Sequence, residues 1–229
     1  GFGGALLGIL VPLALEKHLS AIMLMGMVAV VMMYIAGTHP KWLLLGAAGA
    51  AVFLLVYIRF MGYAGDRVTA WRHPELDPGD TGYQILQSLY AIGSGGFFGL
   101  GPGKSRQKYL YLPFQYNDYI FAIVCEELGL VGALGIMALF ALLIFRGYRI
   151  ARQAENRFST ALAAGLISLI AVQTILNLCV VTNLLPSTGI ALPFFSYGGT
   201  ALAVNLGEMG IVLNISRSGK KRTIQEAAN

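Results

Sequence analysis

The stretch YIFAIVCEELGLVGALGIMALFALLIF, residues 119–145, decides the fold class. Only Glu126 and Glu127 interrupt this apolar run, and a membrane-spanning helix needs about 20 mostly apolar residues. Working outward from it, we find similar runs on both sides. The predicted spans are 2–15, 19–37, 42–60, 119–145, 159–182 and 198–215.

Composition supports the same interpretation. Hydrophobic residues make up 56% of the chain and charged residues only 12%, whereas a soluble domain carries about 25% charged residues. We therefore predict an all-α fold, a polytopic membrane helix bundle in which residues 1–217 form a single membrane domain. Residues 218–229 form a polar tail that we expect to be frayed. Cys125 and Cys179 lie in apolar runs and are predicted to be packed free thiols.

Basic residues predict how the spans are oriented. They gather at Lys41, between Arg146 and Arg157, and between Arg217 and Arg222, three segments that alternation of the spans places on one side. The positive-inside rule makes that side cytoplasmic, with the C-terminus there and segment 61–118 outside. The net charge of +5 is therefore a topology signal, and we do not expect nucleic acid as a partner.

Two irregular segments stand out. Segment 61–118 is too long for an unstructured loop, so we predict a large structured extracellular loop with a short interfacial helix around Ile85–Tyr90. The segment 183–199 contains two prolines and several glycines, which disfavour a continuous helix. Because it is also largely apolar, we expect a re-entrant-like segment, with a simple connecting turn as the alternative.

Asp118 is the strongest candidate for chemistry. It lies where the outer segment meets the fourth span, among aromatic and apolar residues. Partial desolvation should raise its pKa toward that of a general base. The alternative is a carboxylate that caps the helix start.

Further charged residues are candidates for binding. Glu126 and Glu127 lie about 12 Å below Asp118 on the same predicted helix, where they could line a cavity or pair with a basic group. Glu208 lies within the last span without an evident partner. Lys104, Arg106 and Lys108 could meet a lipid-linked phosphate at the interface, or could be solvated surface charges.

Several long motifs resemble one known family. NDYIFA (117–122), EELGLVG (126–132) and LPSTGIALPFFSYGG (185–199) resemble the SEDS (shape, elongation, division, sporulation) family. GYQILQSL (82–89), Gln107-Lys108 and LNISR (213–217) resemble its FtsW/SpoVE branch more than its RodA branch. Members of this family have ten spans with both ends in the cytoplasm, so the resemblance implies that the six predicted spans are the last six and that the first four are missing.

The resemblance implies an enzyme, a peptidoglycan glycosyltransferase. Such enzymes polymerise lipid II into glycan strands at the outer face of the bacterial cytoplasmic membrane, together with a class B penicillin-binding protein and other division or sporulation membrane proteins. The catalytic residue it implies is Asp118. The residues assigned to binding of lipid II and the undecaprenyl-linked glycan are Lys104, Arg106, Gln107, Lys108, Glu126, Glu127, Ser196 and Tyr197. No cofactor is required with certainty, and a divalent cation, Mg²⁺ or Mn²⁺, could assist.

Two other functions compete with the polymerase. A lipid II flippase would use charges distributed through the bilayer, as Glu126, Glu127 and Glu208 could be. A non-catalytic scaffold of the division machinery would depend on neither these charges nor Asp118.

Overall fold

The computed structural model describes residues 4, 8, 12–13, 19–46, 48–49, 52, 62–76, 81–107 and 118–227. The side chains of 62–66, 81 and 219–227 are not described. The regular elements in this part are helices, as predicted. They belong to two compact units: Gly1–Ala50, Ala141–Val172 and Gly199–Asn229 form the first, and Ala51–Phe140 and Gln173–Gly198 form the second.

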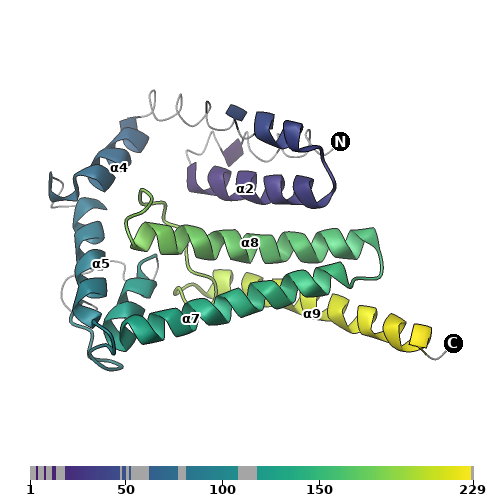
Figure 1. Ribbon diagram of the computed structural model, residues 1–229. Helices are drawn as coiled ribbons and strands as arrows, with labels where there is room; N and C mark the ends of the chain where they lie inside the picture. Colours follow the sequence, from purple (N-terminus) through teal and green to yellow (C-terminus); the bar gives the residue numbers. More distant parts are fainter. Residues whose placement is uncertain are drawn as a thin grey trace. The chain divides into compact units, whose positions relative to one another are not determined.

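The predicted outer segment, 61–118, falls within the second unit. The described part of that segment is structured, as expected: α4 (Gly62–Arg72), the 3-10 turn η1 (Pro74–Leu76) and α5 (Thr81–Gly95) follow one another (Figure 1). Helix α5 confirms the helix predicted around Ile85–Tyr90. Its buried face repeats at Ile85, Ser88 and Ala91, the three-residue spacing of a helix that packs along one side.

The core of the second unit lies between α5, the start of α7 (Ile120–Arg152) and the end of α8 (Arg157–Val181). Ser88 Oγ donates a hydrogen bond to the carbonyl oxygen of Val181, at 2.9 Å, which ties α5 to the end of α8. The buried core residues are Ala91, Tyr119, Phe121, Ala122, Ile123, Cys125, Ala133, Phe140, Val180, Val181 and Leu192.

Helix α7 is interrupted where the sequence predicts a continuous span. Gly129 has φ 67° and ψ −168°, a region of backbone space that is essentially restricted to glycine. The loop that follows α5 fills the break. Leu100 N and Gly101 N donate to the carbonyl oxygens of Glu126 and Glu127, at 2.9 and 3.0 Å.

The same loop supplies acceptors on the other side of the break. Leu130 N and Val131 N donate to the carbonyl oxygens of Gly96 and Phe97, at 2.9 and 3.1 Å. The groups that a helix leaves unpaired at an end are therefore satisfied by residues from outside the helix. The backbones approach so closely that a Cβ atom at Gly129 would clash with the backbone of Gly99 and Phe97.

The first unit contains α2 (Leu19–Ile35), the end of α7, most of α8 and α9 (Gly199–Ala227). Gly147 of α7 lies against the side chain of Ile167 in α8. Nearby, the hydroxyls of Tyr148 and Ser168 share a hydrogen bond of 2.8 Å. The α8 start is capped by Asn156, whose Oδ1 accepts from Ser159 N at 2.8 Å, the usual arrangement at a helix N-terminus.

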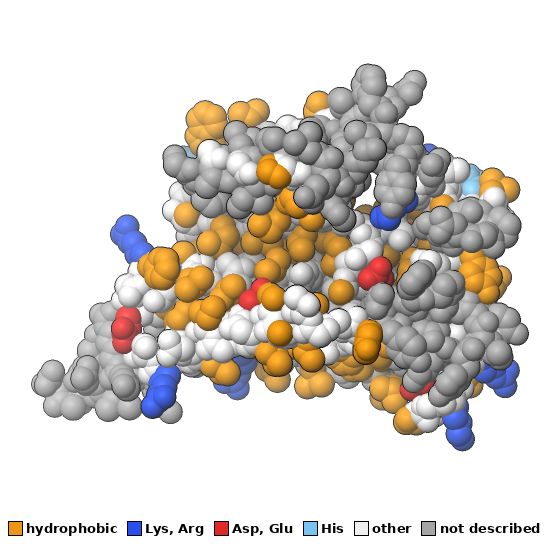
Figure 2. Space-filling model, turned by 180° about the vertical axis from the view of Figure 1, so that it is seen from behind, with side chains coloured by type: hydrophobic (Ala, Val, Ile, Leu, Met, Phe, Trp, Pro, Cys, Tyr) orange, Lys and Arg blue, Asp and Glu red, His pale blue; other side chains and the backbone are white. Residues whose placement is uncertain are grey.

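The helices account for the predicted spans to different degrees. Among the described residues, α7 and α8 are long and apolar enough to cross a membrane, and α2 is a shorter apolar helix. The predicted span 198–215 forms part of α9, in which Glu208 and two asparagines dilute the apolar run. The predicted spans 2–15 and 42–60 lie mostly outside the described residues. Figure 2 shows a face on which hydrophobic side chains are abundant and charged ones few.

Two further expectations can be compared with the structure. The polar tail is helical as far as Ala227, as part of α9, and Lys220, Lys221 and Arg222 are good helix formers; that the tail frays stays a prediction. The segment between α8 and α9 is non-helical, as predicted. Cys125 and Cys179 are free thiols.

Candidate functional site

The main chain of Asp118 is held by an amide from α8. Nδ2 of Asn177 donates to the carbonyl oxygen of Asp118 at 2.7 Å and to that of Ile190 at 2.8 Å. The Asn177 side chain is 1% exposed, so its hydrogen bonds form away from water, where they are costly to lose. One buried side chain thus joins the start of α7 to the segment between α8 and α9.

Helix α4 holds the same segment from a second direction. Arg67 Nη1 donates to the carbonyl oxygen of Ser187, and Trp71 Nε1 donates to that of Asn183, both at 3.0 Å. Arg67 and Trp71 are four residues apart and therefore share one face of α4. Residues 183–190 are consequently fixed through their backbone by side chains from α4 and α8.

The fixed segment faces the carboxylate. Gly189 has φ 69°, the left-handed conformation that glycine adopts at no steric cost. A Cβ atom added at Gly189 would lie 3.4 Å from Oδ2 of Asp118. The glycine therefore leaves room beside the carboxylate that any other residue would occupy.

The environment of Asp118 shifts its titration. Burial raises the pKa of the half-buried Asp118 carboxyl above its ordinary value, and the positive charge of Arg67 opposes this shift. This confirms the direction predicted from the sequence. A carboxylate whose pKa is raised becomes a better proton acceptor, and the nearby guanidinium keeps the ionised form accessible.

A second carboxylate, Glu126, is turned toward the loop after α5. It accepts hydrogen bonds from the Ser105 hydroxyl, from Arg106 N at 3.1 Å and from Gln107 N at 3.4 Å. Of the two roles left open for Glu126, the structure supports the structural one, although its donors are a hydroxyl and backbone amides rather than a basic side chain. Lys104 and Arg106 are exposed beside it, and Lys108 lies outside the described residues.

The other predicted site residues lie elsewhere. Ser196 Oγ accepts from Leu192 N at 2.7 Å and so stabilises its own turn, whereas Tyr197 is 83% exposed. In the described part of the chain, Oε1 of Glu127 and Oε2 of Glu208 are buried without a hydrogen-bond partner. The residues that the structure places next to Asp118 include Arg67, Asn177 and Gly189.

These neighbours were not predicted as site residues. In the sequence, Arg67 is one of several charged residues of the outer segment, and Asn177 is one polar residue in an apolar run. The amide inside a predicted span was the available signal, because buried polar groups there usually have a specific partner.

No metal centre is formed by the described residues. Among them, no group of three or more His, Cys, Asp or Glu side chains lies close enough to hold a metal ion. Next to Asp118, the Arg67 guanidinium and the Nδ2 group of Asn177 are hydrogen-bond donors, whereas Mg²⁺ and Mn²⁺ bind oxygen ligands. We therefore assign no step to a metal ion.

Comparison with known proteins gives consistent matches over most of the chain. The family model described as "Cell cycle protein", for FtsW, RodA and SpoVE, matches residues 3–221. A probable peptidoglycan glycosyltransferase FtsW of Geobacter sulfurreducens is 42% identical over 92% of this chain and 57% of that protein. Stage V sporulation protein E of Bacillus subtilis is 46% identical over 82% of this chain and 51% of that protein.

Solved structures agree with these sequence matches. A structure described as "Structural coordination of polymerization and crosslinking by a peptidoglycan synthase complex" matches 94% of this chain and 60% of its own, with a TM-score of 0.78 and 26% identity. The rod shape determining protein RodA of Thermus thermophilus matches 94% of this chain and 55% of its own, with a TM-score of 0.63 and 24% identity. The chain thus spans little more than half the length of these proteins.

Proposed function

Because the chain belongs to the FtsW/RodA/SpoVE family of cell cycle proteins, which are integral membrane proteins, we propose that it carries the outer-face site of a peptidoglycan glycosyltransferase. The substrate is lipid II and the product is a glycan strand. The observation that carries the proposal is the Asp118 carboxylate, which is half-buried and raised in pKa and whose main-chain carbonyl oxygen accepts a hydrogen bond from Asn177.

The chemistry follows from a carboxylate poised to accept a proton. Asp118 takes the proton from the 4-hydroxyl of the acceptor sugar, and that oxygen forms a bond to the anomeric carbon of the donor. The bond from this carbon to the diphosphate breaks, and the prenyl diphosphate leaves with the electron pair. Positioned general bases contribute about 10²–10⁴-fold to such reactions.

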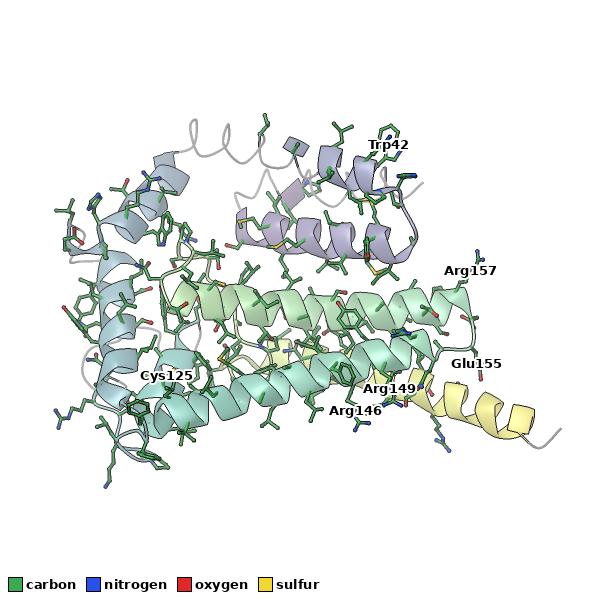
Figure 3. All side chains as sticks on the ribbon, viewed as in Figure 1. Trp42, Cys125, Arg146, Arg149, Glu155 and Arg157 are labelled. Atoms are coloured by element: carbon green, nitrogen blue, oxygen red, sulfur yellow. The ribbon has the colours of Figure 1, made fainter. Side chains whose placement is uncertain are left out.

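The proposed setting is the bacterial cytoplasmic membrane with a cytoplasmic C-terminus. Arg146, Arg149 and Arg157 gather with Glu155 around the α7–α8 connection (Figure 3), which supports a cytoplasmic position for that connection. The proposed partner is a class B penicillin-binding protein, since the similar peptidoglycan synthase complex is described as coordinating polymerization and crosslinking.

The flippase alternative is less well supported. Transport would require intramembrane carboxylates that can meet a moving substrate, and Glu126 was one candidate. Its oxygens instead accept three hydrogen bonds from residues 105–107. No described feature specifically favours a scaffold over an enzyme.

The test is glycan synthesis from lipid II by the full-length protein with its partner. Asp118→Asn should lower the polymerisation rate at least 100-fold while lipid II binding persists. Glu75→Gln is the matched control, because Glu75 is an exposed carboxylate of the same outer segment. Polymerisation by Asp118→Asn at the wild-type rate would exclude the proposed base.

A further inference from the structure

The last described residues of the loop after α5, 104–107, called the anchored turn below, are held by a buried carboxylate. Glu126 is 1% exposed and Ser105 is 2% exposed. The Ser105 hydroxyl and the backbone amides of Arg106 and Gln107 all donate to Glu126. A buried carboxylate with three donors is well satisfied, and breaking such bonds leaves a buried charge uncompensated.

Glu126 also fixes the approach to this turn. Its carbonyl oxygen accepts from Leu100 N at 2.9 Å, beside the break at Gly129. The residue therefore holds the loop twice, by its backbone at Leu100 and by its side chain at residues 105–107. The turn is fixed to the first turns of α7, the helix that Asp118 precedes.

Two cations extend from the anchored turn. Lys104 and Arg106 are exposed, and within the described residues neither takes part in a salt bridge. Their counter-anion is not Glu126, because its hydrogen bonds go to backbone amides and to Ser105. The turn thus presents two positive charges from a fixed backbone, an arrangement suited to an anion.

We propose that Glu126 is a positioning residue that holds Lys104 and Arg106 as a binding turn for the diphosphate of a prenyl-linked sugar. The proposal rests on the proposed glycosyltransferase function and deepens it. Glu126 lies six residues into α7, about 9 Å of helix rise from its start, and Asp118 precedes that start. A substrate with its prenyl chain in the bilayer would place the diphosphate deeper than the sugar, in the same order.

The direction in which Glu126→Gln changes the affinity for diphosphate separates a positioning role from direct contact with the anion. If Glu126 lined the anion site, Glu126→Gln would remove a repelling charge and strengthen diphosphate binding. If Glu126 positions the cations, the same change loosens the turn and weakens binding, by about tenfold where one charge-assisted hydrogen bond is lost. Glu126→Gln should add little when combined with Lys104→Gln and Arg106→Gln, because the cations that it positions are then absent.

The experiment uses the full-length protein in detergent with undecaprenyl diphosphate as the probe. Binding is titrated for wild type, Glu126→Gln, the Lys104→Gln/Arg106→Gln pair and the exposed control Glu75→Gln. Tryptic cleavage after Lys104 and Arg106 is followed in parallel, since a loosened turn is cut faster. Ser105→Ala, which removes one donor, replaces Glu126→Gln if the latter does not fold.

Faster cleavage together with weaker binding in Glu126→Gln supports the proposal. Unchanged or tighter binding, or additive effects with the cation pair, overturns it. Polymerisation measured on the same samples separates a failure of the proposed glycosyltransferase function from a failure of the positioning role of Glu126. Absence of glycan synthesis by the wild-type protein would contradict the proposed function alone. Glycan synthesis by the wild-type protein together with tighter diphosphate binding by Glu126→Gln would contradict the positioning role alone.

Discussion

Gly129→Ala should destabilise the protein strongly, because the break in α7 depends on a backbone conformation open only to glycine. The φ and ψ values of Gly129, 67° and −168°, cost other residues about 1–3 kcal/mol. An alanine Cβ would also meet the backbone of Gly99 and Phe97 at distances that real Cβ atoms do not tolerate. The variant must therefore either retain the strained backbone conformation at residue 129 and displace the loop after α5, or form a continuous helix without the break.

Abandoning the break has its own cost. A straight helix would forfeit the hydrogen bonds from Leu100 and Gly101 to the first part of α7 and those from the second part to Gly96 and Phe97. At about 0.5–1.5 kcal/mol each, these bonds amount to roughly 2–6 kcal/mol, partly recovered by new bonds within the helix. Since the variant adopts whichever conformation has the lower free energy, we expect its free energy of unfolding to fall by about 3 kcal/mol.

The matched control lies six residues further along the same helix. Gly135 has no atom within 4 Å of an added Cβ and lies in regular helix, where alanine is favoured over glycine by about 1 kcal/mol. The free energy of unfolding of the full-length protein in detergent should therefore fall for Gly129→Ala and stay level or rise for Gly135→Ala. Tryptic cleavage after Lys104 should accelerate only in the former. Equal stabilities for the two variants, within about 0.5 kcal/mol, would refute the interrupted helix.

Three further predictions concern the surroundings of Asp118. Arg67→Gln removes the charge that lowers the Asp118 pKa, so the acidic limb of the pH–rate profile should move to higher pH, whereas Arg67→Lys should leave it in place. Gly189→Ala is strained by about 1–2 kcal/mol and crowds the carboxylate, so it should lower the polymerisation rate about tenfold. Gly37→Ala is the control: Gly37 is also left-handed but has nothing within 4 Å of an added Cβ, so this change should lower only the free energy of unfolding. Asn177→Ala removes the donor of one buried and one part-buried carbonyl oxygen and should cost about 2–4 kcal/mol of unfolding free energy. A loss under about 0.5 kcal/mol would contradict the bridging role.

Local composition predicted the helices α7 and α8 and the irregular segment between α8 and α9, because apolar length and proline and glycine content are properties of one stretch of chain. The break at Gly129 could not be predicted in this way. A glycine in an apolar run is compatible with close helix packing, and the groups that stabilise the break belong to residues 96–101.

The site shows the same division. The carboxylate at Asp118 and the direction of its pKa were predictable from the residues on either side. Its supports were not, since Arg67 and Ser187 are 120 positions apart and Asn177 and Asp118 are 59 apart. The role of Glu126 was left open because a carboxylate within a span looks the same in sequence whether it meets a substrate or a backbone amide.

The supports of the site share one property that bears on function. Asn177, Arg67 and Trp71 all donate to main-chain carbonyl oxygens, so these three hydrogen bonds to Asp118 and the segment facing it do not depend on which side chains their acceptor residues carry. The carboxylate of Asp118 contributes nothing to these bonds, since only its carbonyl oxygen is used by Asn177. Replacing Asp118 by Asn therefore removes the proton acceptor and its charge attraction to Arg67, but none of these three hydrogen-bonding side chains. If the carboxylate serves chemistry rather than folding, Asp118→Asn must lose polymerisation and keep the wild-type free energy of unfolding.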